Sequence, residues 1–287
     1  MILITGATGN LGNNVIHNLL KKVPASGVAA LVRNTAKAKS LEEKGIKICI
    51  GDYNDKSSLV KAMQGITKLF LVSIESENSF SDHKNVIDVA KESGVKHIYY
   101  TGGALNKQVT RSMLGSLTDS YITTENYIIN SGLTYTIFQN GLYAETIPFF
   151  IGYDAVNTGI TFPAGDAKAT FAKSSEMAEA IANVLASNEH DNRIYLLTGS
   201  PTYSFQDIAE ILSELSGKSV SYNSPLPEDY EAKLKEYGVT ENDIYFSSLL
   251  AAIIRNHEYD VRESDLEELL DRRPTDLKIY LEETFLA

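Results

Sequence analysis

The chain has 287 residues, 43% of them hydrophobic and 22% charged, a composition typical of globular proteins that excludes disorder, collagen-like repeats and a coiled coil as descriptions of the whole. Lys and Arg number 26 against 37 Asp and Glu, so the net charge of −11 leaves no positive excess for phosphate backbones and nucleic acid is not expected as a partner. The single cysteine, Cys49, excludes an internal disulfide and a cysteine-rich metal site.

The first residues do not have the pattern of a targeting signal. Residues 1–4 are apolar but are followed at once by Thr5 and Gly6, whereas a secretory signal needs a basic start and a longer apolar stretch. No apolar run approaches the roughly 20 residues that span a bilayer. We therefore expect a cytoplasmic protein with no membrane partner.

Strand and helix signals alternate along the first half of the chain. Short apolar runs predict strands, and apolar residues spaced three or four apart predict the helices between them. The predicted strands are residues 1–5, 28–33, 46–50, 68–74, 97–101 and 134–138. The predicted helices are residues 10–22, 35–44, 55–63, 80–93 and about 119–131. This order indicates the α/β class, a doubly wound parallel sheet with helices on both faces.

The second half changes character. Residues 141–171 are rich in aromatics and glycine, and their hydrophobic periodicity is weak. After them we predict helices at 174–187 and 204–216, strands at 193–198 and 219–223, and a mostly helical, acidic remainder at 228–286. Ser204 and Gly217 are the expected caps of the 204–216 helix. We predict one domain from residues 1–140 plus about 174–198, and a smaller, mostly helical C-terminal lobe from 141–173 plus 199–287.

A glycine-rich turn follows the first predicted strand and opens the first helix. Residues 6–12 read Gly-Ala-Thr-Gly-Asn-Leu-Gly, which is the context that a dinucleotide-binding motif requires. The first glycine permits a tight turn, the second lets the backbone approach a pyrophosphate, and the third allows close packing of helix on strand. The alternative is a glycine-rich turn with no ligand. The predicted cofactor contacts here are Gly6, Thr8, Gly9, Asn10, Leu11 and Gly12.

The end of the second strand indicates which dinucleotide binds. An NAD site usually has an acidic residue about 20 residues past the glycines, but residues 28–34 contain none and Arg33 stands there instead. A guanidinium suits a 2′-phosphate, and Lys37 adds a second positive charge. The predicted cofactor is therefore NADPH, unless Arg33 is simply an exposed arginine at a strand end.

Further candidate contacts lie after the next strands, at the edge where ligands bind in open α/β sheets. Asp52 is placed to accept a hydrogen bond from the adenine amino group, but Asp-Tyr-Asn-Asp at 52–55 is equally a turn sequence. The cofactor contacts predicted at this edge are Asp52, Tyr53, Ser73, Ile74, Thr101 and Gly102.

These motifs together resemble the atypical branch of the short-chain dehydrogenase/reductases and, within it, the NmrA-like family with its quinone and triphenylmethane dye reductases. The matching pieces are Ile4-Thr5-Gly6-Ala7-Thr8-Gly9-Asn10-Leu11-Gly12, Leu31-Val32-Arg33-Asn34, Asp52-Tyr53 with Asp55, Thr124-Glu125, and Asn140-Gly141-Leu142-Tyr143 with Glu145. The resemblance implies a Rossmann domain that holds NADPH, a substrate-binding lobe over the nicotinamide, and hydride transfer to a quinone-like or dye-like electron-poor acceptor.

One departure concerns catalysis. The superfamily's usual pair is Tyr-x-x-x-Lys, whereas this chain has Tyr121 followed by Glu125. The missing lysine argues against alcohol dehydrogenase or epimerase chemistry, in which it lowers the pKa of the tyrosine. Tyr121 remains the only catalytic candidate of this type. His83 is a second candidate proton donor, although a structural role is favoured.

Reduction of a quinone requires mainly that acceptor and nicotinamide are held together, because water can supply the proton. Aromatic walls suit a flat acceptor, so Asn140 and Tyr143 are the predicted substrate contacts. Phe149 and Phe150 are favoured as packing in the lobe's own core or at a subunit contact, and Tyr153 is a further aromatic in the same segment. The five histidines have no metal-ligand spacing, and no metal is predicted.

Two functions of different classes remain open on the sequence alone. The first is an NADPH-dependent reductase of small quinone-like acceptors, and the second is a dinucleotide-binding redox sensor without catalysis. An epimerase is a third and poorer reading because the lysine is missing. The sequence leaves the oligomeric state open, a homodimer included.

Overall fold

A parallel sheet of seven strands forms the centre of the computed structural model, which describes residues 1–74, 76, 78–108 and 116–286. The strand order is β10-β6-β5-β4-β1-β2-β3, so the direction of winding reverses between β1 and β4. The strands are β1 (Ile2–Ile4), β2 (Val28–Val32), β3 (Lys47–Ile50), β4 (Lys68–Leu71), β5 (His97–Gly103), β6 (Thr134–Asn140) and β10 (Arg193–Leu197). The doubly wound α/β fold predicted from the sequence is confirmed.

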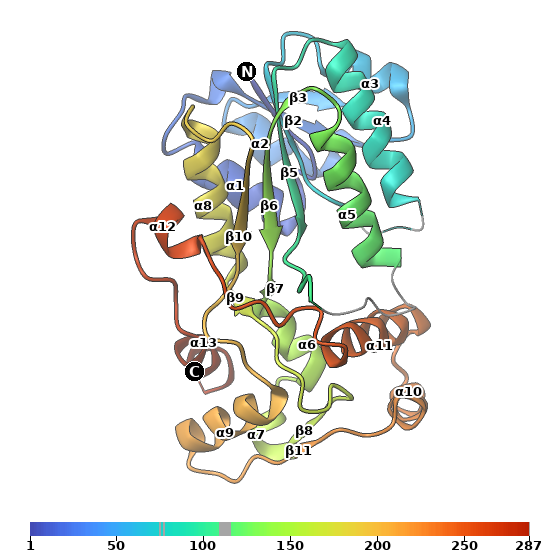
Figure 1. Ribbon diagram of the computed structural model, residues 1–287, viewed down its shortest axis with the longest axis vertical. Coiled ribbons are helices and arrows are strands. Elements are labelled where there is room, and N and C mark those ends of the chain that lie inside the picture. Colours follow the sequence, from blue (N-terminus) through green and yellow to red (C-terminus); the bar gives the residue numbers. More distant parts are fainter. Residues whose placement is uncertain (75, 77, 109–115, 287) are drawn as a thin grey trace.

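Helices cover both faces of this sheet (Figure 1). One face packs against α1, α2 and α8 through a cluster that includes Leu19, Leu41 and Ile181. The other packs against α3, α4 and α5 through a cluster that includes Leu59, Val86 and Ile128. The helices are α1 (Asn10–Leu19), α2 (Lys39–Glu43), α3 (Lys56–Ala62), α4 (Ser79–Glu92), α5 (Ser116–Ile129) and α8 (Ser174–Ala186). Burial on both faces explains why the inner strands β1 and β2 are apolar throughout rather than alternating.

In the first half of the chain, one predicted helix and one predicted strand differ from the structure. The helix predicted at 35–44 is divided into a 3-10 turn, η2 (Thr35–Lys37), and the short α2, because the side chain of Asn34 accepts a hydrogen bond from the Ala36 N–H and tightens the first turn. The strand predicted at 68–74 ends at Leu71, and residues 72–74 form a loop at the edge of the sheet.

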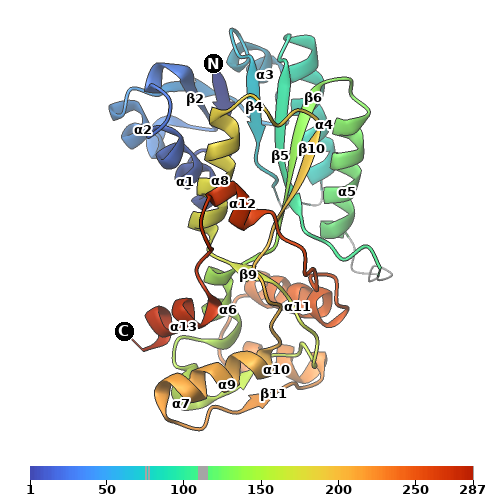
Figure 2. The same ribbon diagram turned by 60° about the vertical axis from the view of Figure 1, so that its left-hand side comes forward.

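A second, smaller lobe lies beyond the carboxyl ends of the strands (Figure 2). Its core contains Phe150, Phe162 and Phe205. The lobe elements are β7 (Leu142–Tyr143), η3 (Ala144–Thr146), α6 (Ile147–Ile151), α7 (Ala155–Thr158), β8 (Ile160–Thr161), β9 (Phe171–Ala172), α9 (Phe205–Ser216), β11 (Tyr222–Asn223), α10 (Pro227–Glu236), α11 (Glu241–Arg255) and α13 (Leu277–Phe285). Outside this lobe, between α1 and β2 of the main sheet, lies one further 3-10 turn, η1 (Ala25–Gly27).

Local signals placed α9 correctly. Ser204 caps its N-terminus in a capping box with Asp207, and Gly217 ends it in the left-handed conformation, with φ of 68°. The strand predicted at 219–223 is shorter: β11 pairs with β8 in a two-stranded sheet and does not join the main sheet. Among the described residues, no helix combines the length and the apolar character needed to cross a membrane.

The two lobes are interleaved. β10 extends the main sheet beside β6, whereas α12 (Leu266–Leu270), from the predicted lobe segment, packs on α8, and its Leu266 and Leu270 join the core of the sheet. The division into 1–140 with 174–198 and 141–173 with 199–287 stays a prediction.

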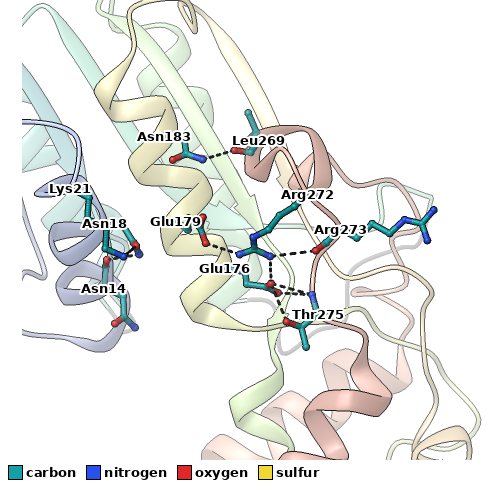
Figure 3. A network of polar contacts seen from close by, with 10 residues as sticks. All are labelled: Asn14, Asn18, Lys21, Glu176, Glu179, Asn183, Leu269, Arg272, Arg273 and Thr275. Atoms are coloured by element: carbon teal, nitrogen blue, oxygen red, sulfur yellow. Dashed lines mark hydrogen bonds and ion pairs between the residues drawn. The ribbon is translucent and has the colours of Figure 1, made fainter.

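A cluster of charged and polar side chains connects α8 to the segment after α12 (Figure 3). Glu176 is 5% exposed, and its carboxylate accepts hydrogen bonds from the guanidinium of Arg272 at 2.6 Å and from the backbone N–H and hydroxyl of Thr275. Arg272 also pairs with Glu179 at 2.6 Å. Because a buried carboxylate is satisfied here by several donors, we expect this cluster to stabilise the fold.

We expect Glu176→Ala to lower the free energy of unfolding by about 1–3 kcal/mol, because Arg272 and the Thr275 N–H lose their shared acceptor. Urea unfolding measures this. Glu43→Gln is the control: Glu43 is exposed and 4.0 Å from Lys39, so its loss should change the free energy of unfolding by less than about 0.5 kcal/mol. Equal effects of the two substitutions would contradict this role of Glu176.

Candidate functional site

A cavity of about 660 Å³ opens at the carboxyl edge of the sheet, around the ends of β1, β2, β3 and β4. Most of the residues predicted to bind the cofactor line it: Gly6, Thr8, Gly9, Asn10, Leu11, Gly12, Arg33, Lys37, Asp52, Tyr53, Ser73 and Ile74. We call it the nucleotide cavity. It lies where the winding of the sheet reverses, which is the position at which open α/β sheets bind ligands.

The glycine turn forms one side of the nucleotide cavity. Gly6 has φ of 59°, a conformation that side chains disfavour. A Cβ on Gly12 would collide with the carbonyl oxygen of Gly6, so only glycine permits the helix to start this close to β1. Gly9 caps α1 without any side-chain hydrogen bond to the first turn. The N–H groups at the start of α1 are therefore not capped by a side chain, as an anion site requires.

Two cations stand at another side of this cavity. Arg33 follows β2, and Lys37 lies in the 3-10 turn that the Asn34 side chain caps. Both side chains are exposed. The turn brings the second cation to the same cavity as the first, and together they favour an anionic group there.

The end of β3 contributes Asp52, Tyr53 and Asn54. Asp52 Oδ1 accepts the Asn54 N–H at 3.0 Å and thereby closes the turn. The Tyr53 hydroxyl donates to the Val72 carbonyl at 3.2 Å, and burial raises the pKa of Tyr53 strongly. The sequence left two roles open for Asp52, a turn residue or an adenine contact. The structure shows the turn role, and Asp52 also lines the cavity.

The loop after β4 is held by three side chains behind it. The N–H groups of residues 72, 73 and 74 donate in turn to Thr5 Oγ1 at 2.9 Å, Thr101 Oγ1 at 2.9 Å and His83 Nε2 at 3.0 Å. Thr101 is 2% exposed and does not line the nucleotide cavity. The structure therefore places Thr101 behind Ser73, as a support for the loop rather than at the cavity surface.

The contacts of His83 define its protonation. Because Nε2 accepts the Ile74 N–H, the ring proton lies on Nδ1, which donates to Thr124 Oγ1 at 3.1 Å. His83 is fully buried, and burial lowers its pKa to about 4. A neutral ring that already uses both nitrogens in structural contacts is not poised to donate a proton, so the structural reading of His83 is supported.

Gly102 is in contact with a buried carboxyl group. A Cβ on Gly102 would collide with Glu125 Oε1. Glu125 is 7% exposed, its Oε2 accepts from Gln139 Nε2 at 2.7 Å, and its Oε1 has no hydrogen-bond partner among the described residues. Burial raises the pKa of Glu125 to about 7. Gly102, like Thr101, lies outside the lining of the nucleotide cavity, and its lack of a side chain makes room for Glu125.

The catalytic candidate Tyr121 packs on the next residue of β5. A Cβ on Gly103 would lie 2.8 Å from Tyr121 Cδ2 and 3.4 Å from the hydroxyl of Tyr259. Tyr121 is 9% exposed. Two tyrosine rings, one from α5 and one from the lobe, therefore meet at the carboxyl end of β5, outside the lining of the nucleotide cavity.

The predicted substrate contacts Asn140 and Tyr143 lie near each other. Asn140 Nδ2 donates to the Tyr143 hydroxyl at 3.4 Å, and Asn140 Oδ1 is buried without a hydrogen-bond partner in the described part of the chain. Phe150 is in the lobe core, as expected. Phe149 contacts the rings of Phe150 and Phe246 but is 46% exposed, and Tyr153 is 76% exposed, so neither is core.

Two features of the site escaped the sequence analysis. Asp82, in the first turn of α4, lines the nucleotide cavity. Ser174, at the start of α8, accepts from Asn10 Nδ2 at 3.3 Å and donates through its hydroxyl to Glu145 at 3.0 Å. These contacts join residues up to 164 positions apart, and no local spacing signals them. An acid in a first helical turn is the only hint at Asp82, and it is shared by many helices.

The model of the NmrA-like family matches residues 1–281. The chain is 39% identical over 243 residues to quinone oxidoreductase 2 of Escherichia coli strain K12, which covers 84% of this chain and 83% of that protein. Two crystal structures superpose with a TM-score of 0.90 at 34% identity, each covering 99% of this chain and 100% of the other. They are Citrobacter sp. triphenylmethane reductase complexed with NADP(H) and the E. coli NADPH-dependent quinone oxidoreductase QOR2 complexed with NADPH.

The raised pKa of Glu125 predicts a pH-dependent stability. The folded chain retains the proton up to about pH 7, whereas the unfolded chain loses it near 4.5. The protonated carboxyl group therefore costs the folded chain nothing below pH 4.5, and the free energy of unfolding falls as the pH rises from 4.5 to 7.

Glu125→Gln imitates the protonated form. We expect its free energy of unfolding, relative to that of the unmodified chain, to increase by up to about 3 kcal/mol as the pH rises from 4.5 to 8. Urea unfolding at a series of pH values measures the difference. Glu92→Gln, at an exposed position of α4, is the control for the loss of one carboxylate. If the free energies of unfolding of Glu125→Gln and the unmodified chain differ by the same amount at every pH, the raised pKa of Glu125 is refuted.

Proposed function

Because the chain belongs to the NmrA-like family, we propose that it is an NADPH-dependent oxidoreductase that transfers a hydride to a quinone-like or other electron-poor aromatic acceptor. The relatives named as quinone oxidoreductase and triphenylmethane reductase support this reaction class. The observation that carries the proposal is the nucleotide cavity itself. It combines an uncapped helix N-terminus and a glycine turn with the two cations Arg33 and Lys37.

NADPH fits the residues present. The glycine turn leaves the start of α1 open to a diphosphate, and Arg33 and Lys37 match the additional charge of a 2′-phosphate. Residues 28–34 contain no acid that would repel this phosphate. We assign Ser73 and Ile74 to the wall beside the cofactor because Thr101 and His83 fix their backbone. Thr101 itself then acts through Ser73.

The chemistry demands little of the chain beyond positioning. When bound, NADPH supplies the hydride. A quinone that accepts it becomes a phenolate stabilised by its ring, and water supplies the proton that completes the hydroquinone. The chain must hold acceptor and cofactor in contact and exclude wrong orientations. We assign Asn140 and Tyr143 to the acceptor, because Asn140 ends β6, Tyr143 follows it in β7, and a hydrogen bond joins the two side chains.

A steady-state assay tests the reductase against the sensor. NADPH oxidation at 340 nm is followed with a panel of small quinones, and NADPH binding is measured separately by calorimetry. Turnover with at least one quinone supports the reductase. Tight binding of NADPH without turnover on any quinone would instead favour the sensor, because the missing lysine after Tyr121 already removes the usual catalytic pair.

We further propose that the protein works in the cytoplasm. Its proposed partner is a small molecule, and we expect it to bind neither nucleic acid nor a membrane. A homodimer stays a prediction that the oligomeric state in solution tests.

The cofactor preference depends on Arg33. We expect the unmodified chain to bind NADPH more tightly than NADH. Arg33→Ala should reduce the difference between the two binding free energies, the gap, by roughly 1–3 kcal/mol, the range for a charge-assisted hydrogen bond. Calorimetric titration with both nucleotides measures the gap. Arg193→Ala, at an exposed arginine at the start of β10, is the matched control and should leave the gap unchanged. Equal affinities of the unmodified chain for NADPH and NADH would sink the assignment.

The proton source is tested at Tyr121. We expect Tyr121→Phe to retain most of the quinone reductase kcat, whereas loss of a required general acid would cost about 10²–10⁴-fold. Tyr143→Ala should mainly raise KM, because it removes a contact made equally in the bound and reacting states. Steady-state kinetics with one good quinone decide between these outcomes. A collapse of kcat in Tyr121→Phe with Tyr143→Ala almost unchanged would overturn both assignments.

A further inference from the structure

Glu145 of the lobe is bound to the start of α8. The residue lies in η3, and its carboxylate accepts hydrogen bonds from the Ser174 N–H at 3.1 Å and from the Ser174 hydroxyl at 3.0 Å. Lys173, the N-cap residue of α8, makes no side-chain hydrogen bond to the helix. Glu145 therefore supplies, from 29 positions away in the sequence, an acceptor for the first turn of α8 that the N-cap residue does not provide.

The same Ser174 hydroxyl reaches the glycine turn. It accepts a hydrogen bond from Asn10 Nδ2 at 3.3 Å, and Asn10 lines the nucleotide cavity. The Asn10 amide is also held through its oxygen, because Oδ1 accepts from Asn14 Nδ2 at 3.0 Å. Ser174 is 2% exposed, so water has little access to this hydroxyl. Two side-chain hydrogen bonds, which meet at one buried hydroxyl, thus connect Glu145 to the turn proposed to hold the cofactor.

Glu145 is also two residues from Tyr143, which we assign to the acceptor. Tyr143 ends β7, a strand of two residues that pair with Phe171 and Ala172 of β9. A two-stranded ladder this short is at best marginally stable by itself. The chain then turns at once into η3, where the Thr146 hydroxyl donates to the Tyr143 carbonyl at 2.6 Å. The position of Tyr143 therefore depends on how η3 is held, and Glu145 holds η3 on α8.

We propose that Glu145 is a positioning residue, which keeps Tyr143 at a fixed place relative to the glycine turn and thereby keeps the acceptor in place relative to the cofactor. This inference rests on the proposed reduction of a quinone-like acceptor by NADPH. Glu145 acts through Tyr143 and touches neither reactant. Because hydride transfer requires donor and acceptor in close, aligned contact, a displacement of this wall by about 1 Å is enough to weaken the productive complex.

Steady-state kinetics with one good quinone and saturating NADPH test this role. We expect Glu145→Ala to raise the KM for the quinone about 10-fold, because it frees the wall that holds the acceptor. The affinity for NADPH, measured by calorimetry, should change less than about twofold, because the glycine turn keeps its own contacts. Glu145→Gln retains an oxygen that accepts the Ser174 N–H, so its KM should stay within about threefold of that of the unmodified chain.

A double substitution separates positioning from a general loss of stability. In the Tyr143→Ala background, Glu145→Ala should change KM by less than about twofold, because the side chain that Glu145 positions is gone. Glu176→Ala is the matched control. Glu176 also lies in the first turn of α8, but it binds Arg272 and Thr275, so its loss should lower the free energy of unfolding and leave KM unchanged.

Three outcomes would overturn the proposal and leave Glu145 a helix cap. They are an unchanged KM in Glu145→Ala, an equal rise of KM in Glu176→Ala, and a rise that persists in the Tyr143→Ala background. If Glu145→Ala does not fold, Glu145→Asp replaces it, because its carboxylate is one methylene farther from Ser174. Absence of turnover on every quinone would refute the proposed function and this inference with it, whereas turnover with an unchanged KM in Glu145→Ala overturns the inference alone.

Discussion

The carbonyl oxygen of Gly6 occupies the place where a side chain on Gly12 would start. This close approach determines how α1 is placed relative to β1 and to the nucleotide cavity. With no Cβ between them, α1 begins directly over the end of β1. This places the free N–H groups of its first turn in the cavity. It also brings α1 against α8, so that Leu19 and Ile181 share one core. A side chain at position 12 would displace the helix and, with it, the packing of α8.

Beside this turn, where Val72 lies against Gly6, buried polar side chains hold the loop that forms the next part of the cavity wall. Thr5, Thr101 and His83 each accept one N–H from the loop at 72–74, so the loop needs no regular strand partner to satisfy its backbone. Buried acceptors of this kind specify one loop conformation, because any other conformation leaves a buried N–H unpaired. The conformation of the cavity wall therefore depends on residues from β5 and α4 that lie behind it.

Sequence patterns were sufficient where the determinant is local. The glycine turn, the alternation of strands and helices, and the Ser204 and Gly217 caps of α9 are all encoded within a few residues, and each is found as predicted. Patterns failed where a residue acts through a distant partner. Thr101 was predicted at the cavity but supports Ser73, and Asp82 was missed because its relation to Asp52 exists only after β3 and α4 meet. The pairing of β11 with β8 is a tertiary choice of the same kind.

The contacts of α8 have a consequence for cooperativity. At its start Ser174 binds Glu145 of the lobe and Asn10 of the glycine turn. Along its length Glu176 binds Arg272 and Thr275. At its end Lys68 of β4 donates to the carbonyls of Leu185 and Ser187. Elements from both lobes thus hold one helix, and neither lobe can release it alone. Unfolding of either lobe therefore removes contacts of α8 and destabilises the other lobe, and a nucleotide bound at the sheet stabilises the lobe through this helix.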